Sequence, residues 1–283
     1  YLITLNFKRM KKIILSLLII TMVSCEKIID VELTTSEPQL VIEASINWEK
    51  GTNGSQQTIL ISKTTSYFED DVAKVSGANV LIKNSKNESF EFFEGVSNSG
   101  ETGKYICQNF VPELGENYTL LVTVEGETYT SSEKLIATAT ISNIEQRNDL
   151  GFNSDEIGIK VNFMDLPTEK SFYMMRFDTA VDAYPIYEIL DDKYKESNII
   201  SGLYTNEDLK TDELINISLF GVTERYYNYM KRLLGASSAA SNGPFQVAPT
   251  KVKGNIVNST NPENFAYGYF RLSETYKMTY SVK

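Results

Sequence analysis

Histidine is absent from this sequence of 283 residues, which also contains only two cysteines and one tryptophan. Without histidine the chain has no Ser-His-Asp or Cys-His catalytic site, and it lacks the residue that many zinc sites use. Two cysteines are too few for a scaffold built from disulfides. These absences exclude several large classes of enzyme, and we expect a protein without catalytic residues.

Positive charge is also scarce, because the sequence has 27 lysines and arginines against 37 acidic residues, which gives a net charge of -10. A surface of this sign opposes binding to nucleic-acid phosphates. The sequence has neither a phosphate-binding glycine-rich loop nor a calcium loop of the D-x-D-x-D-G type. We interpret its acidic clusters as solvated loops; they lie at residues 69–71, 155–156, 191–192 and 207–208. The sequence therefore predicts no nucleic-acid partner, no metal and no cofactor.

Long hydrophobic runs are missing, apart from one near the start of the chain. Met10 is followed by two lysines and by an apolar stretch that ends near residue 23. This run is shorter than the roughly 20 residues that a membrane-spanning helix needs, and its basic start is typical of an export signal. We expect residues 1–24 to be a signal peptide, with translation starting at Met10 and residues 1–9 lying upstream.

Cys25 ends a Met-Val-Ser-Cys segment that looks like a bacterial lipobox. In such a segment the cysteine receives diacylglycerol and becomes the new N-terminus. We therefore predict that Cys25 is lipidated and that residues 25–37 form a tether; the alternative is an ordinary secretory signal that contains a cysteine. The second cysteine, Cys107, lies in an alternating segment, and we interpret it as a small buried residue of a strand.

The segment 38–136 predicts seven β-strands separated by turn residues and no helix. The expected strands are 40–46, 58–62, 78–83, 89–93, 104–108, 118–124 and 128–130. This pattern favours an immunoglobulin-like or transthyretin-like β-sandwich. The paired cysteines of antibody domains are absent.

The segment 137–283 predicts a second β-rich domain. Its expected strands are 141–144, 157–163, 171–177, 214–220, 266–272 and one near 278–282. The polar stretch 182–213 is interpreted as an exposed insertion. The loops 236–244 and 258–264 flank the same strands, and whether they form a binding rim stays open.

Residues 223–235 have the helical spacing of apolar side chains and are the best helix candidate. Thr223 can cap the start and Gly235 can end the helix. The tyrosines 226, 227 and 229 suggest either an aromatic binding face or a helix that docks on the sheet with Tyr227 outside. The spacing favours the docked helix.

Thr179 lies in an Asp-Thr-Ala sequence that looks like the short O-glycosylation motif of exported Bacteroidota proteins. A short motif of this kind arises easily by chance, and a plain strand end is the alternative. We keep Thr179 as a candidate glycosylation site.

Several short motifs occur in an order that resembles an uncharacterised family of Bacteroidota outer-membrane lipoproteins, the domain of unknown function numbered 4249. The motifs are the lipobox, Ile-Glu-Ala at 42–44, Gly-Ala-Asn-Val-Leu-Ile at 77–82, Gly-Lys-Tyr at 103–105, Tyr-Tyr at 226–227, Lys-Gly-Asn-Ile at 253–256 and Ala-Tyr-Gly-Tyr-Phe at 266–270. The resemblance implies an accessory role beside a TonB-dependent outer-membrane transporter. It supplies no catalytic residues.

Two kinds of function remain after these exclusions. The first is a noncatalytic lipoprotein of the outer membrane that captures a ligand for, or otherwise assists, a TonB-dependent transporter. The alternative is a surface glycan-binding module or a hydrolase that uses two carboxylates; a purely structural role also stays open. We expect the protein to face the cell exterior, although the residues after Cys25 are only partly acidic, which keeps the periplasmic face open.

Overall fold

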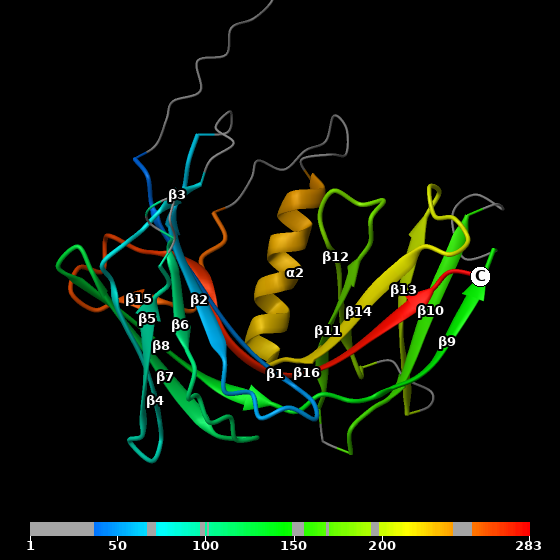
Figure 1. Cartoon of the computed structure of the whole chain (residues 1–283), viewed down its shortest axis with the longest axis horizontal. Coiled ribbons are helices and arrows are strands. Elements are labelled where there is room, and N and C mark those ends of the chain that lie inside the picture. The colour runs from blue at the N-terminus through cyan, green and yellow to red at the C-terminus, as the bar shows by residue number, and fades with distance from the viewer. Residues whose placement is uncertain are drawn as a thin grey trace, which may run out of the picture. The chain divides into compact units, whose positions relative to one another are not determined.

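A computed structural model describes residues 37–66, 72–96, 100, 102–148, 156–167, 170–193, 198–239 and 251–283. Pro38–Lys283 forms one compact unit (Figure 1). It is built mainly from strands, which confirms the prediction of a mainly β chain. The strands are β1 (Leu40–Glu49), β2 (Gln57–Lys63), β3 (Ala73–Lys74), β4 (Asn79–Asn84), β5 (Ser89–Glu94), β6 (Lys104–Cys107), β7 (Asn117–Val124), β8 (Glu127–Ile136), β9 (Ile141–Arg147), β10 (Ile157–Met164), β11 (Phe172–Asp178), β12 (Ile186–Asp191), β13 (Ile199–Asn206), β14 (Leu214–Gly221), β15 (Val257–Asn258) and β16 (Tyr267–Ser281).

The helix α2 (Glu224–Ala239) is present where the sequence predicts it. The amide of Tyr226 donates to the hydroxyl of Thr223 over 3.3 Å, which confirms the cap. Gly235 does not end the helix, because α2 runs on to Ala239. The small residues that follow Gly235 tolerate helical backbone well enough to extend it. Among the described residues, no helix is long and apolar enough to cross a membrane.

Seven strands of the first half, residues 38–136, pair with β16 from the end of the chain in a closed circuit. Their order is β16, β1, β2, β6, β5, β4, β7 and β8, and β8 pairs again with β16. Alternate residues of these strands point inward and form one hydrophobic core, which includes Ile42, Ile59, Tyr105, Leu120 and Phe270. All seven strands expected before residue 137 are present, and β3 is an additional short one. The circuit is more closed than the two separate sheets of an immunoglobulin-like sandwich.

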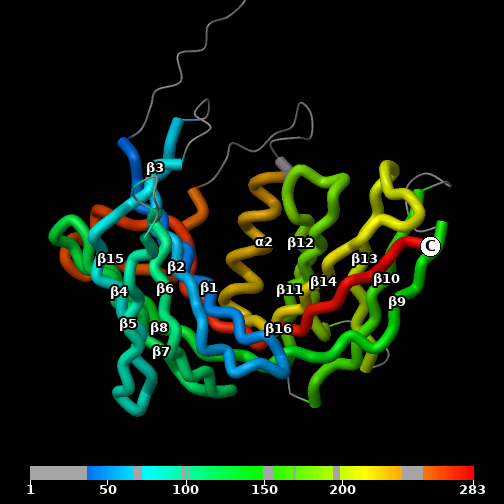
Figure 2. The backbone as a smooth tube through the Cα atoms, viewed as in Figure 1, coloured from blue at the N-terminus to red at the C-terminus, as the bar shows by residue number. Residues whose placement is uncertain are grey.

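The long strand β16 belongs to both halves of this unit. Its first part pairs in parallel with β1, from Val41 opposite Tyr267 to Glu49 opposite Thr275. Its last part pairs with β14 in antiparallel orientation, as Figure 2 shows by the neighbouring tubes. The sequence predicted two shorter strands here, and this was wrong, because the polar residues 273–275 look like a break although they are buried and paired.

The second half has its own core between the sheet β12-β11-β14-β16 and the three-stranded sheet β13-β10-β9. The interpretation of 182–213 as an exposed insertion was wrong. β12 pairs with β11 and β13 pairs with β10, and Ile200, Tyr204 and Leu209 are buried. The polar residues before and after these strands hid them, and no residue of β12 is fully buried. The division of the chain at residues 136 and 137 stays a prediction, although residues 256, 266, 270 and 272 complete the first core.

Candidate functional site

The candidate site lies on the face of the sheet that is turned away from the two larger cores. Side chains alternate along a strand, so neighbouring strands in register place every second residue on one face. Ser45 of β1 is opposite Arg271 of β16, and Asn47 is opposite Ser273, whereas the intervening Ile46 is buried in the core. β11 and β14 continue this face, with Arg176 paired to Ser218. The result is a polar strip of sheet bordered by α2.

A cavity of about 540 Å³ lies between α2 and this face, and we call it the aromatic cavity. Its volume falls in the range of small-molecule sites. Six aromatic residues from the four elements β12, β14, α2 and β16 line it: Tyr187, Phe220, Tyr226, Tyr229, Tyr267 and Tyr269. Its charged lining residues are Glu43, Arg176 and Arg271. The cavity is thus an aromatic chamber with an excess of positive charge.

Three tyrosines form the wall beneath α2. The rings of Tyr226 and Tyr229 lie 4.9 and 4.7 Å from that of Tyr269, the first in a T-shaped arrangement. All three are less than a tenth exposed. Burial raises the pKa of Tyr229 to about 12, so its hydroxyl is neutral at physiological pH. The helix therefore docks on the sheet, and two tyrosines of its docked face also line the cavity. Tyr227, predicted to lie outside, is half-buried, and its hydroxyl donates to Asp191 over 2.9 Å.

Arg271 is the most enclosed charge of the cavity, with an exposed fraction of 4%. Its guanidinium lies over the rings of Phe220 and Tyr226, at 4.9 and 5.2 Å from their centroids. Its Nη1 donates to the hydroxyl of Ser273 and its Nη2 to the side-chain oxygen of Asn47. Its buried Nε has no hydrogen-bond partner among the residues that the structure describes. The two side chains that accept from Arg271 there, Ser273 and Asn47, are both neutral.

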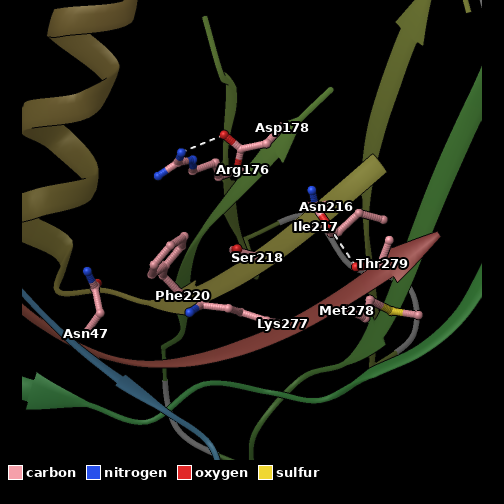
Figure 3. A pocket seen from close by; sticks show the side chains of 10 residues that line it. All are labelled: Asn47, Arg176, Asp178, Asn216, Ile217, Ser218, Phe220, Lys277, Met278 and Thr279. Carbon is pink, nitrogen blue, oxygen red and sulfur yellow. Dashed lines mark hydrogen bonds and ion pairs between the residues drawn. The ribbon is translucent and has the colours of Figure 1, made fainter. Parts of the chain in front are cut away.

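A second cavity, of about 490 Å³, adjoins the first along β14 and β16, and we call it the polar cavity. The two share Asn47, Arg176 and Phe220 as lining residues. Figure 3 shows Arg176 joined to Asp178 on β11, above the side chain of Phe220. Arg176 therefore has a carboxylate partner within its own strand, unlike Arg271.

Two glycines and an asparagine hold the strand that carries Arg271. Gly268 has a φ of +95°, and a Cβ there would lie 2.0 Å from the carbonyl oxygen of Ile42. A Cβ on Gly254 would lie 1.7 Å from the carbonyl oxygen of Gly268. Asn255 accepts from and donates to the backbone of Phe270, both over 2.8 Å. The motifs at 253–256 and 266–270 thus place β16 against β1 and set the position of the cavity floor.

The predicted modification sites have separate outcomes. Cys25, with the signal peptide and nearly all of the tether, lies outside the described residues, so its lipidation stays a prediction. Thr179 is half-buried; its hydroxyl donates to Asp182 over 2.8 Å and lies 3.3 Å from that of Tyr204. Its glycosylation also stays a prediction. Cys107 is buried, as predicted, and burial raises the pKa of its thiol.

The predicted acidic clusters and rim loops are only partly described. Residues 69–71 and 155 lie outside the described residues, Asp191 and Asp192 are half-buried, and Glu207 and Asp208 are exposed. No group of three potential metal ligands occurs among the described residues. The loop 258–264 is tied to the β7–β8 hairpin, because Asn258, Asn261 and Asn264 all donate to Glu127. Most of the other rim loop, 236–244, lies outside the described residues.

The sequence interpretation missed Arg271, Arg176 and the cavity that they line. One signal was present, because an arginine follows two aromatic residues in the middle of an apolar strand at 269–272. A charge at such a position is rarely buried without a reason. Its neighbours on the face, however, come from β1, β11 and β14, and the sequence does not show that these strands meet.

The comparisons with known proteins assign no activity. No curated protein matches the sequence. A cytokine receptor complex is 6% identical, with a TM-score of 0.26, covering 67% of this chain and 86% of that one. A two-domain fibronectin type III segment from chicken tenascin is 11% identical, with a TM-score of 0.20 over 65% and 90%. A DUF4785 family protein from Legionella pneumophila is 14% identical, with a TM-score of 0.26 over 64% and 52%.

These TM-scores are too low to assign a fold. The family comparison is different, because the model described as "Domain of unknown function (DUF4249)" matches residues 26–279. The match covers almost the whole chain and includes the motifs around β1, α2 and β16. The protein belongs to the DUF4249 family.

Proposed function

We propose that this protein is a noncatalytic lipoprotein of the outer membrane that captures a small ligand in the aromatic cavity and delivers it to a TonB-dependent transporter. The observation that carries the proposal is the aromatic cavity of about 540 Å³, which is shaped by α2 and walled by buried rings. Its charged lining residues are one glutamate and two arginines, and this set does not include the two carboxylates that a hydrolase without histidine would need. Such a site is suited to binding.

The order of the segments along the chain supports delivery. Pro38 begins the compact unit directly after the proposed tether, so a lipid on Cys25 would hold this unit at the membrane that contains the proposed transporter. The excess of acidic over basic residues, which grows when the basic residues of the signal peptide are removed, would keep this body from lying flat on anionic lipid. We expect the anchored protein to face the cell exterior.

We also propose that the first half is an immunoglobulin-like sandwich whose two sheets are joined at their edges, followed by a second β-rich domain that carries α2. Two observations support this. β5 pairs with β4 through residues 89–92 but with β6 through 93 and 94. β8 pairs with β16 through only two residues, Leu135 and Ile136.

The transporter partnership is tested by extraction of the protein from cells that express it at native level, with an affinity tag after Lys283. Mass spectrometry should find a β-barrel transporter in stoichiometric amount. A variant with Cys25→Ser, which is not anchored beside the transporter, should recover much less. Recovery of the wild-type protein alone would contradict the partnership.

Lipidation is tested separately with the two cysteines as a matched pair. Cys25→Ser should remove the acyl groups and release the protein from the membrane fraction, because the thiol that carries the lipid is gone. Cys107→Ser changes a buried cysteine and should leave the anchoring unchanged. Membrane retention of the Cys25→Ser protein would show that another segment anchors it.

A glycan-binding module or a carboxylate-based hydrolase is the second candidate. Its support is the number of tyrosines around the cavity, since sugars stack on aromatic rings. Tyr226, Tyr229 and Tyr269, however, pack against one another and leave no exposed flat face. A glycan array on the purified chain tests this candidate; specific binding to an oligosaccharide would favour it over the first proposal.

A further inference from the structure

Arg271 is a buried cation without a counter-ion. Removing a guanidinium from water is costly, and proteins usually offset the cost with a carboxylate. Among the described residues no carboxylate forms an ion pair with Arg271, whose hydrogen-bond acceptors are the neutral side chains of Ser273 and Asn47. The two aromatic rings beside it offset part of the cost. In the part of the chain that the structure describes, the buried guanidinium of Arg271 is therefore not ion-paired.

More exposed cations of the same protein do have carboxylate partners. Lys50 pairs with Glu274, Lys277 pairs with Glu49, and Arg225 lies 3.5 Å from Glu133, although the three cations have side chains 37%, 50% and 57% exposed. Arg176, which also lines the cavity, pairs with Asp178. Arg271 is more buried than these cations and would gain most from a carboxylate partner, yet none of the described residues provides one. This contrast indicates that the partner of Arg271 comes from outside the chain.

We propose that the aromatic cavity binds an organic monocarboxylate with an apolar or aromatic body, and that Arg271 pairs with its carboxylate. The planar guanidinium fits a carboxylate in a two-point contact. The amide oxygen of the exposed Asn47, now bonded to Nη2, is the acceptor that the carboxylate replaces. This proposal rests on the proposed capture function and names its ligand class.

The charge around the cavity favours one negative charge over two. Of the two arginines that line the cavity, only Arg271 has no carboxylate partner among the described residues, because Arg176 already has Asp178. Glu43 lines the same cavity, and its repulsion is about twice as strong for a doubly charged phosphate as for a monocarboxylate at the same place. Apart from Ser45 and Asn47, the rest of the lining is apolar or aromatic, including Met174, Met230 and the tyrosine wall. A phosphate ester or an inorganic anion therefore fits less well than a carboxylate on a hydrophobic body.

The first experiment uses matched probes on the full chain. 3-Phenylpropionate, its neutral amide and phenyl phosphate are titrated by ligand-observed NMR or calorimetry. We expect the carboxylate to bind about tenfold or more tightly than the other two, because only it satisfies Arg271 without added repulsion. Equal binding of acid and amide would overturn the proposal, and tighter binding of phenyl phosphate would overturn the preference for a single charge.

The second experiment starts with a measurement on the ligand-free protein, which does not depend on the probe. Arg271→Met replaces the buried charge with an apolar side chain of similar length, so the melting temperature of the ligand-free protein should stay the same or rise. The same variant should lose carboxylate binding by about tenfold or more. Lys277→Met removes a cation that lines the neighbouring polar cavity and should leave binding unchanged.

A clear fall in the melting temperature of the ligand-free Arg271→Met protein would show that Arg271 is a structural residue, and would overturn the proposal. The transporter partnership is tested independently by the affinity extraction. Carboxylate binding without a recovered transporter would leave the ligand class standing and remove the delivery step. A recovered transporter with equal binding of acid and amide would leave the partnership standing and remove the proposed ligand class.

Discussion

Glu188 on β12 illustrates how burial acts on a single carboxyl group. It is half-buried, it accepts a hydrogen bond from the amide of Leu203 over 2.7 Å, and burial raises its pKa above the ordinary value. The folded protein thus holds this proton more tightly than the unfolded chain. The stability that comes from this protonated Glu188 is fully present below the ordinary carboxyl pKa, and it is lost as pH rises through the raised pKa of the folded state.

Glu188→Gln should remove this pH dependence, because the amide oxygen still accepts from Leu203 and carries no charge. We expect its melting temperature to exceed that of the wild type at about pH 7 and the gap to close towards about pH 4. Thermal unfolding across this range checks the expectation, with the exposed Glu91→Gln as control. A constant gap at all pH values would contradict it.

Gly268 shows a residue whose role is steric. Alanine there meets both a φ of +95° and the carbonyl oxygen of Ile42, whereas alanine at Gly126 meets only a φ of +81° in open space. Gly126→Ala should cost about 1–2 kcal/mol of unfolding free energy. Gly268→Ala should cost more than about 4 kcal/mol. Urea unfolding compares the two, and equal losses would show that β1 and β16 move apart easily.

Single residues differ in how far the sequence could predict them. The burial of Cys107 followed from the alternation of its own strand. The role of Arg271 could not follow, because its environment comes from Phe220, Tyr226 and Asn47, which lie 45 or more positions away in the sequence. Local patterns determine which face of a strand a residue occupies, but they do not show what covers that face.

At the scale of elements, α2 is the part that the sequence predicts best, since its apolar spacing and cap are both local. Thr223→Ala should lower the unfolding free energy by about 1 kcal/mol, because the amide of Tyr226 loses its acceptor. Thr223→Ser keeps the hydroxyl and should restore most of the loss. Denaturant unfolding of the three proteins measures this, and an equal loss in both variants would assign the effect to the lost methyl group.

The strands β12 and β13 mark the limit of local prediction for elements. Short, partly exposed strands between polar turns resemble loops in sequence, and these two are stabilised by pairing with β11 and β10. The same holds for the middle of β16, where Ser273 and Thr275 are fully buried although they are polar. Whether such a segment forms a strand depends more on its pairing partners than on its composition.

At the scale of the whole molecule, β16 links the two halves. It closes the strand circuit of the first half, and its Phe270 and Leu272 are almost completely buried in the first core. The range 38–136 alone lacks this strand. The parallel pairing of β1 with β16 joins the two ends of the compact unit, and a sequence pattern does not predict a contact of that separation.

A fragment of residues 38–136 should therefore fail to fold by itself, because β1 and β8 both lose β16 as a partner. Far-ultraviolet circular dichroism and thermal unfolding test this, with the full chain as reference. Cooperative unfolding of the fragment would show that the first half is stable without β16. Recovery of structure after addition of a peptide of residues 251–283 would support the shared strand.

The central claim is that the aromatic cavity is a binding site for a carboxylate. The most direct measurement is a crystal structure of the protein soaked with 3-(4-bromophenyl)propionate, in which anomalous scattering locates the bromine. We predict one bromine site inside the aromatic cavity beside Tyr226 and Tyr229, with the carboxylate on Arg271. Bromine only at other places, or an empty cavity at saturating ligand, would contradict the account.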